Sequence, residues 1–213
     1  MKLVFSLFFI GSLSVRGQTN DKPVMLIHYV FDSFTNGKVK LKSGKVYDQV
    51  LNYNLVTKEM IFEQPGGKYL AIAHPEDVDT ITFSNRKFVP ANKAFYEWLE
   101  GDTYPLFIEY TCTIKEQGAQ TGFGTTNTSA ATSVKSLLKD GGAYALKLPD
   151  EYQVIPLHVF YIRVNTQYYR ANNEQQLAKL FPAKKQQIRD WAKKNKTNFS
   201  MKEDVALLVK QIQ

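Results

Sequence analysis

Along most of the chain, apolar and polar residues alternate with the two-residue period of half-buried β-strands. Residues 38–42 alternate lysine with valine or leucine, and the strand-like segments 59–63 and 68–72 flank a Gln-Pro-Gly-Gly turn. Similar segments follow one another from about residue 24 to residue 170, with no long amphipathic helix between them. The pattern predicts an antiparallel β meander or sandwich-like domain over residues 18–170, and it argues against a parallel α/β sheet.

The apolar period becomes helical from Asn173 onwards. Apolar residues recur at three- and four-residue spacing in three successive stretches, and Asn173 with Gln176 has the spacing of a capping box, as does Ser200 with Glu203. The sequence therefore predicts two or three short helices in residues 171–213, either docked on the β domain or forming a small bundle of their own. The expected fold class is α+β, mainly β.

Residues 118–133 interrupt the strand pattern with Gly, Thr, Ser, Ala, Asn and Gln, and Phe123 is their only large apolar residue. This composition predicts a polar loop of unusual length. Such a loop is either a binding loop or lid, or an excursion without a function of its own.

The first residues have the pattern of a secretory signal peptide. Met1-Lys2 is a short basic start, and residues 3–15 form an apolar run of 13 residues, whereas about 20 are needed to span a bilayer. We expect residues 1–17 to be a leader cleaved near Gln18, and a buried N-terminal strand or helix is the alternative. No cysteine follows for a lipid anchor, and the lone Cys112 reads as a small residue in a strand. The expected location is the periplasm or the exterior, with peripheral contact to the outer membrane as one variant, and no transmembrane span in the mature chain.

The formal net charge of +7 is unevenly distributed. Residues 1–17 carry two basic residues and no acidic ones, residues 18–170 carry 16 of each sign, and residues 171–213 carry nine basic and four acidic residues. The expected β domain is therefore neutral and the helical segment basic. This asymmetry argues against a generally basic protein, and export argues against nucleic acid as a partner.

Two groups of residues are candidates for a binding surface. Basic side chains of the helical segment could contact an anionic surface, or could form an ordinary solvated face; they are Lys184, Lys185, Arg189, Lys193, Lys194 and Lys196. Aromatic side chains of the strands could form a binding surface for a sugar or a protein, with core packing as the alternative; they are Tyr96, Trp98, Tyr168 and Tyr169.

No catalytic motif is present in the sequence. It lacks G-x-S-x-G, H-E-x-x-H, the phosphate-binding G-K-[ST] and C-x-x-C. His28, His74 and His158 each stand alone, and Asp77 with Asp79 lacks a third ligand, so we expect no metal and no cofactor. No residue is assigned as catalytic. The enzyme question stays open, with the balance against an enzyme.

Several stretches resemble a group of uncharacterised exported proteins of Gram-negative bacteria. They are residues 51–55, 59–62 and 78–88, the Gly/Thr/Ser loop before a strand pair, and Leu180-Phe181-Pro182 followed by a lysine-rich helix. The resemblance extends over most of the mature chain. It implies a β-rich periplasmic or secreted protein with a helical C-terminus, and no established activity.

The function we expect is that of a non-catalytic envelope or secreted protein that binds a protein or a glycan, or has a structural role. A neutral β body with spare aromatic residues, and the absence of a catalytic motif, favour this interpretation. Two alternatives remain at this stage. One is a hydrolase or metal-dependent enzyme whose active-site residues are dispersed in the sequence, and the other is a binder of anionic surfaces that acts through the basic helices.

Overall fold

The computed structural model describes residues 25–101, 103–116, 120–121, 124–125, 138–140 and 142–212. The expected signal peptide, residues 1–17, lies outside the described residues. So does most of the expected polar loop at 118–133, of which only two pairs of residues are described.

Ten strands form one antiparallel sheet, in the order β14-β13-β8-β7-β6-β5-β1-β2-β3-β4, which confirms the predicted fold class. Two consecutive meanders, β1–β4 and β5–β14, are joined where β1 pairs with β5. The strands are β1 (Thr35–Leu41), β2 (Val46–Asn54), β3 (Glu59–Gln64), β4 (Lys68–Ala71), β5 (Val78–Phe83), β6 (Arg86–Ala91), β7 (Ala94–Glu100), β8 (Leu106–Glu116), β13 (Tyr152–Val164) and β14 (Gln167–Arg170).

Shorter elements complete the described chain. Two small two-stranded sheets are formed by β9 (Gln120–Thr121) with β10 (Gly124–Thr125), and by β11 (Lys139–Asp140) with β12 (Ala143–Tyr144). The 3₁₀-helix η1 (Pro75–Asp77) precedes β5. The C-terminal segment contains α2 (Glu174–Leu180), the 3₁₀-helix η2 (Pro182–Lys184), α3 (Lys185–Asn195) and α4 (Lys202–Ile212).

Close approach of backbones fixes the join between the two meanders. Gly37 of β1 pairs with Phe83 of β5, and a Cβ atom at Gly37 would lie 2.5 Å from the Phe83 Cβ and 2.7 Å from the carbonyl oxygen of Thr82. Only glycine fits at this position. After Phe83, the turn residues Ser84 and Asn85 both have positive φ, at 50° and 58°, as a two-residue hairpin turn requires. That turn places Arg86 as the first residue of β6.

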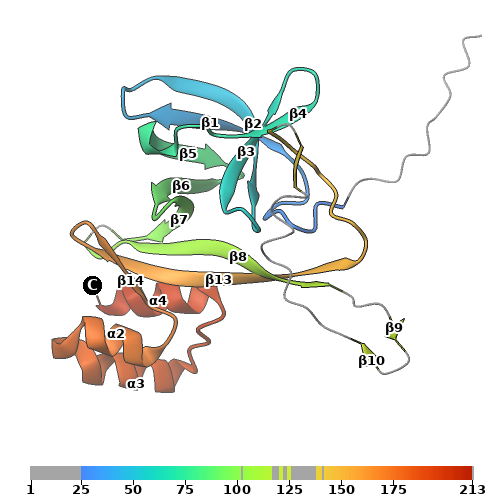
Figure 1. Ribbon diagram of the computed structural model, residues 1–213. Coiled ribbons are helices and arrows are strands. Elements are labelled where there is room, and N and C mark those ends of the chain that lie inside the picture. Colours follow the sequence, from blue (N-terminus) through green and yellow to red (C-terminus); the bar gives the residue numbers. More distant parts are fainter. Residues whose placement is uncertain are drawn as a thin grey trace, which may run out of the picture.

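Two apolar cores share one face of the sheet. The first lies among the curled strands β1–β7 and includes Leu51, Tyr53, Ile81 and Phe88. The second lies between the C-terminal helices and the long pair β8–β13, where Ile108 and Phe160 are among the strand residues that meet apolar side chains of the described helices α2, α3 and α4. Figure 1 shows these helices packed below β8 and β13, with β1–β7 above. The helical segment is therefore docked on the sheet, because apolar side chains of its helices form one continuous core with those of β8 and β13.

The helix starts agree in part with the capping predictions. Asn173 caps α2, since its side chain accepts a hydrogen bond from the Gln176 N–H at 2.9 Å, as expected. The capping box predicted for Ser200 and Glu203 is wrong. Helix α4 begins at Lys202, and the nearby backbone N–H of Asn198 donates instead to the Asp204 carboxylate at 2.8 Å. Glu203 is thereby released from a capping role.

Candidate functional site

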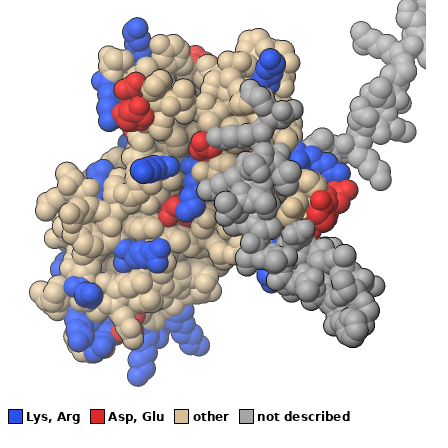
Figure 2. Space-filling model, in the orientation of Figure 1, with Lys and Arg blue, Asp and Glu red and all other residues tan. Residues whose placement is uncertain are grey.

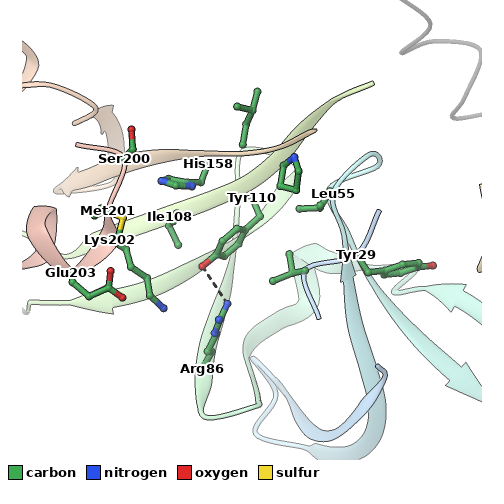
Figure 3. Close-up of a pocket in the computed structure, with 13 residues that line it drawn as sticks. Tyr29, Leu55, Arg86, Ile108, Tyr110, His158, Ser200, Met201, Lys202 and Glu203 are labelled. Atoms are coloured by element: carbon green, nitrogen blue, oxygen red, sulfur yellow. Dashed lines mark hydrogen bonds between the residues drawn. The ribbon is translucent and has the colours of Figure 1, made fainter. Parts of the chain in front are cut away.

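A cleft of about 350 Å³ opens where the sheet meets the start of α4. One wall is formed by β8 and β13, a second by residues 200–203, and a third by the N-terminal segment around Tyr29 together with Leu55 after β2. Arg86 reaches the cleft from β6. Figure 3 shows these residues converging from segments that are far apart in the sequence.

Strand register aligns four polar side chains across the floor of this region. Glu97 of β7 is opposite one residue of β6 and one residue of β8. Arg86 lies two residues from the partner in β6, and Tyr110 lies two residues from the partner in β8. His158 of β13 is directly opposite Tyr110. Because side chains two apart in a strand share a face, Arg86, Glu97, Tyr110 and His158 lie on one face of the sheet, along a diagonal across four strands that is called here the polar row. The row lies between the two apolar cores.

A hydrogen-bonded chain links three members of the polar row. The Tyr110 hydroxyl donates to Glu97 Oε2 at 2.5 Å and accepts from Arg86 Nη1 at 3.3 Å. Arg86 Nη1 is 3.5 Å from the same carboxylate oxygen, and the guanidinium lies 4.8 Å from the centre of the Phe31 ring. Only 5% of Glu97 is exposed, so the tyrosine and the arginine compensate a carboxylate that water does not reach.

Burial raises the pKa of Tyr110 far above its ordinary value of 10, and the neighbouring Glu97 carboxylate adds to this effect. The positive charge of Arg86 opposes the rise, and the more distant Glu203 reinforces it. The hydroxyl therefore stays protonated and serves as a donor. It is unsuited to act as a general base.

Two cations face the cleft with N–H donors that are not used in contacts with the described residues. The hydrogen bond and ion pair of Arg86 engage Nη1 alone, and Lys202 makes no ion pair or side-chain hydrogen bond with any described residue. In the view of Figure 3, the side chains of Arg86 and Lys202 extend toward the same part of the cleft, and a dashed line joins Arg86 to Tyr110. The cleft can thus offer positively charged donors to a group that enters it.

The basic residues predicted from the sequence lie on α3 and its flanks, away from the cleft. Lys184 donates to the carbonyl oxygen of Ile212, and Arg189 pairs with Glu174 at 3.1 Å, so these two tie the helices together. The other four basic residues are exposed and form no ion pair with any described residue; they are Lys185, Lys193, Lys194 and Lys196. Figure 2 shows Lys and Arg side chains gathered over this end of the molecule.

The predicted aromatic group is divided by the sheet. Tyr96, Trp98 and Tyr168 share the face opposite the polar row, where Tyr96 stacks on Tyr161 with ring centres 4.9 Å apart and is only 2% exposed. A cation covers Trp98, since Lys87 Nζ lies 4.0 Å from the ring centre. Tyr169 lies on the other face and is exposed. The structure therefore brings three of the four together, in a cluster whose rings largely cover one another.

The three histidines do not come together. His28 is fully buried, His74 is exposed beside Glu76, and His158 lines the cleft. Within the described part of the chain, no three or more His, Cys, Asp or Glu side chains are close enough to hold a metal ion. Asp79 pairs with Lys40, and burial raises the pKa of the Cys112 thiol to about 11. None of these groups forms a second site.

The polar row was not found from the sequence because its members come from four different strands. One signal was present: Glu97 is a carboxylate at a position of β7 where alternation puts the side chain on the same face as Phe95. A charged residue at such an inward position needs partners. The sequence does not say which strands will supply them.

Comparison of the chain with protein-family models, with curated protein sequences and with solved structures found no match. Nothing therefore assigns the chain to a family, while the β-rich fold with C-terminal helices is observed directly. Among the described residues, every helix is too short or too polar to cross a membrane.

Proposed function

We propose that the protein is an exported, non-catalytic binding protein that holds part of a partner protein in the cleft beside α4. The observation that carries this proposal is the cleft itself. It is built from the sheet, α4 and the N-terminal segment, and it combines an apolar wall with Arg86, Tyr110 and His158 of the polar row and with Lys202. Such a combination of apolar surface with a few convergent polar groups is typical of ligand sites.

Apolar side chains at the cleft favour a protein over a glycan. Met201 lines the cleft with 49% of its surface exposed, and Leu55 and Ile108 line the cleft as well. Apolar side chains that gather at a concave site are typical of protein interfaces. The aromatic rings that a sugar could stack on are mostly packed against one another on the far face of the sheet.

The compartment belongs to the same proposal. The leader pattern of residues 1–17 and the single cysteine support export to the periplasm or the exterior. Mass spectrometry of the protein from the envelope or the medium should show a new N-terminus near Gln18. An intact Met1 would contradict export.

Site-specific crosslinking tests the binding proposal. A photoreactive benzophenone amino acid replaces Met201 at the cleft or, as the matched control, Leu207, which is exposed on α4 but does not line the cleft. We expect a discrete protein adduct from position 201 only, and its purified partner should bind the wild-type protein but not the Met201→Trp variant, whose indole fills the cleft. Equal adducts at both positions, or an adduct to an oligosaccharide, would contradict a protein-binding cleft.

An enzyme remains the second candidate, because the polar row places an acid, a hydroxyl and an imidazole beside one cleft. Against it, the Tyr110 hydroxyl is held as a donor, and no described hydrogen bond joins His158 to a nucleophile. Screening with ester, amide and glycoside substrates decides between the two. Turnover that is lost in both Glu97→Gln and His158→Ala would replace the binding proposal.

A further inference from the structure

The outer edge of β13 has a stretch with no strand paired to it among the described residues. Strand β14 pairs only with residues Tyr161–Val164 of β13, whereas β8 pairs with nearly its whole length. Just beyond β14, the Ala171 N–H donates to the Phe160 carbonyl, and the Asn172 side chain accepts from the Phe160 N–H at 2.6 Å. The outer edge of β13 is therefore hydrogen-bonded from Phe160 to Val164, and it is unpaired among the described residues before Phe160.

Alternation shows which backbone groups point out from that edge. Both backbone groups of Phe160 point toward the β14 side, while the Arg163 N–H points the other way and donates to the Pro105 carbonyl. The even-numbered residues Pro156 and His158 therefore direct their backbone groups outward, and both residues also line the cleft. The open edge and the cleft are parts of one surface.

Pro156 limits what can pair there. It has no N–H, so this part of the edge presents the Pro156 carbonyl and the His158 N–H but no donor at position 156. In a parallel strand, the residue opposite Leu157 can use both groups. Its backbone N–H donates to the Pro156 carbonyl, and its carbonyl accepts from the His158 N–H. A long strand cannot add, because Phe160 is already occupied and the donor at 156 is missing. The edge suits a short extended segment that stops at Phe160.

We propose that the cleft binds the C-terminal end of an extended polypeptide, whose chain pairs with Pro156 and His158 and whose terminal carboxylate lies between Arg86 and Lys202. This proposal rests on the proposed function and names the part of the partner that is recognised. Because Arg86 is on β6, three strands away from β13, the segment leaves the edge before Phe160 and crosses the face of β13 and β8 over about three residues to reach the two cations. Its last side chain packs against the apolar wall at Ile108 and Leu55. Main-chain pairing supplies affinity, and the carboxylate supplies specificity.

Charges of both signs surround the proposed carboxylate. Glu97 is already compensated by Tyr110 and Arg86, whereas Glu203 lines the cleft without a partner among the described residues. The Glu203 carboxylate opposes an entering anion. Removing the charge of Glu203 should therefore strengthen binding, so the proposal also predicts a variant with increased affinity.

Fluorescence polarisation with synthetic peptides tests the proposal on the whole mature protein. The probe is a mixture of random hexapeptides labelled with fluorescein at the N-terminus, prepared once with a free C-terminal carboxylate and once as the amide. We expect the free acid to bind about tenfold tighter than the amide, as for a charge-assisted hydrogen bond. Lys202→Ala should abolish most of this difference and Glu203→Gln should increase it, while Lys179→Ala, an exposed lysine of α2, should change nothing.

Arg86→Ala could also lower stability, so Lys202→Ala, whose side chain makes no ion pair with a described residue, carries the decisive comparison. Equal binding of acid and amide, or dependence on acidic side chains regardless of amidation, would overturn the assignment of a chain terminus. No binding of either mixture would overturn it as well. The proposal that the cleft binds a protein is tested separately, by the crosslinked partner and by the Met201→Trp variant.

Discussion

Two buried glutamates lie on adjacent strands of the sheet and face opposite sides of it. Glu97 of β7 is 5% exposed and Glu109 of β8 is 7% exposed. Each carboxylate accepts a hydrogen bond from a tyrosine, Tyr110 at 2.5 Å and Tyr161 at 3.1 Å. The same solution to burying a charge is therefore used twice, once on each face.

The cations beside the two glutamates differ. Lys58, from the turn between β2 and β3, directs its single ammonium group to Glu109 at 2.6 Å, among side chains that form a packed aromatic cluster. Arg86 reaches Glu97 through one nitrogen, stacks on Phe31 and keeps other donors for the cleft. The guanidinium presents five N–H donors in a fixed plane, and the contacts with Glu97 and Tyr110 use Nη1 alone. The comparison separates an ion pair enclosed by an aromatic cluster from one whose cation faces the cleft.

Removing either cation should produce the largest loss of stability. Lys58→Ala and Arg86→Ala each leave a buried carboxylate without its cation, and we expect the free energy of unfolding to fall by about 3 kcal/mol, the low end for a broken buried pair because each cation is partly exposed. Urea unfolding measures this loss. Lys38→Ala, which removes an exposed pair with Asp48, should cost less than about 1 kcal/mol.

Peptide binding measured on the same two variants sharpens the comparison. The Lys58→Ala variant should bind the peptides as tightly as the wild type under conditions in which it is folded. The Arg86→Ala variant should lose peptide binding. Equal effects on binding would mean that the two glutamate sites do not differ in function.

A third buried titratable group, His28, should dominate the acid sensitivity. Burial lowers its pKa from 6.5 to about 4, an effect that the adjacent Ala145 backbone opposes only in part. Between these values the unfolded chain binds a proton that the folded chain does not. Stability should therefore fall by about 2 to 3 kcal/mol as the pH drops from about 6.5 to about 4, and level off below.

Chemical unfolding at several pH values measures this slope, with His74→Gln at an exposed position as the control. The slope should flatten in His28→Gln. If it persists there, the acid sensitivity belongs to other groups, with Glu97 and Glu109 the first to test.

Removing a tyrosine hydroxyl should have a smaller effect. Tyr110→Phe and Tyr161→Phe each delete one hydrogen bond to a buried carboxylate, at a cost of about 1.5 to 3 kcal/mol, with the larger loss at Tyr110 because its bond is shorter. Thermal or urea unfolding checks the order. The reverse order would show that Glu109 depends more on its tyrosine than Glu97 does.

The basic face of α3 should contribute least to stability. Reversing the charges of Lys185, Lys193, Lys194 and Lys196 to glutamate should change the free energy of unfolding by less than about 0.5 kcal/mol per site, since these side chains are exposed. If this face binds anionic surfaces, the wild-type protein sediments with phosphatidylglycerol vesicles at low salt and the variant does not. Reversal of Lys42 and Lys45, at the other end of the molecule, is the control. Sedimentation that is indifferent to salt would contradict surface binding through α3.

Local patterns in the sequence were sufficient for much of the fold. Alternation around Val39 and the Gln-Pro-Gly-Gly turn predicted strands that the structure contains, and helical spacing after Asn173 predicted the C-terminal helices. These features depend on neighbours within a few residues, so a single segment carries the information. The Ser200 cap failed because Asp204 competes for the same loop, and spacing alone does not distinguish the two carboxylates.

The sequence by itself determined the fold class, the neutral β body and the basic helical end, because alternation, helical period and charge are properties of contiguous residues. The tertiary structure alone decided how the two meanders join at Gly37 and that the helices dock on β8 and β13. It also decided that Arg86, Glu97, Tyr110 and His158 share one row. Register between strands distant in the sequence aligns these side chains, and a shift of one residue would turn any of them to the opposite face.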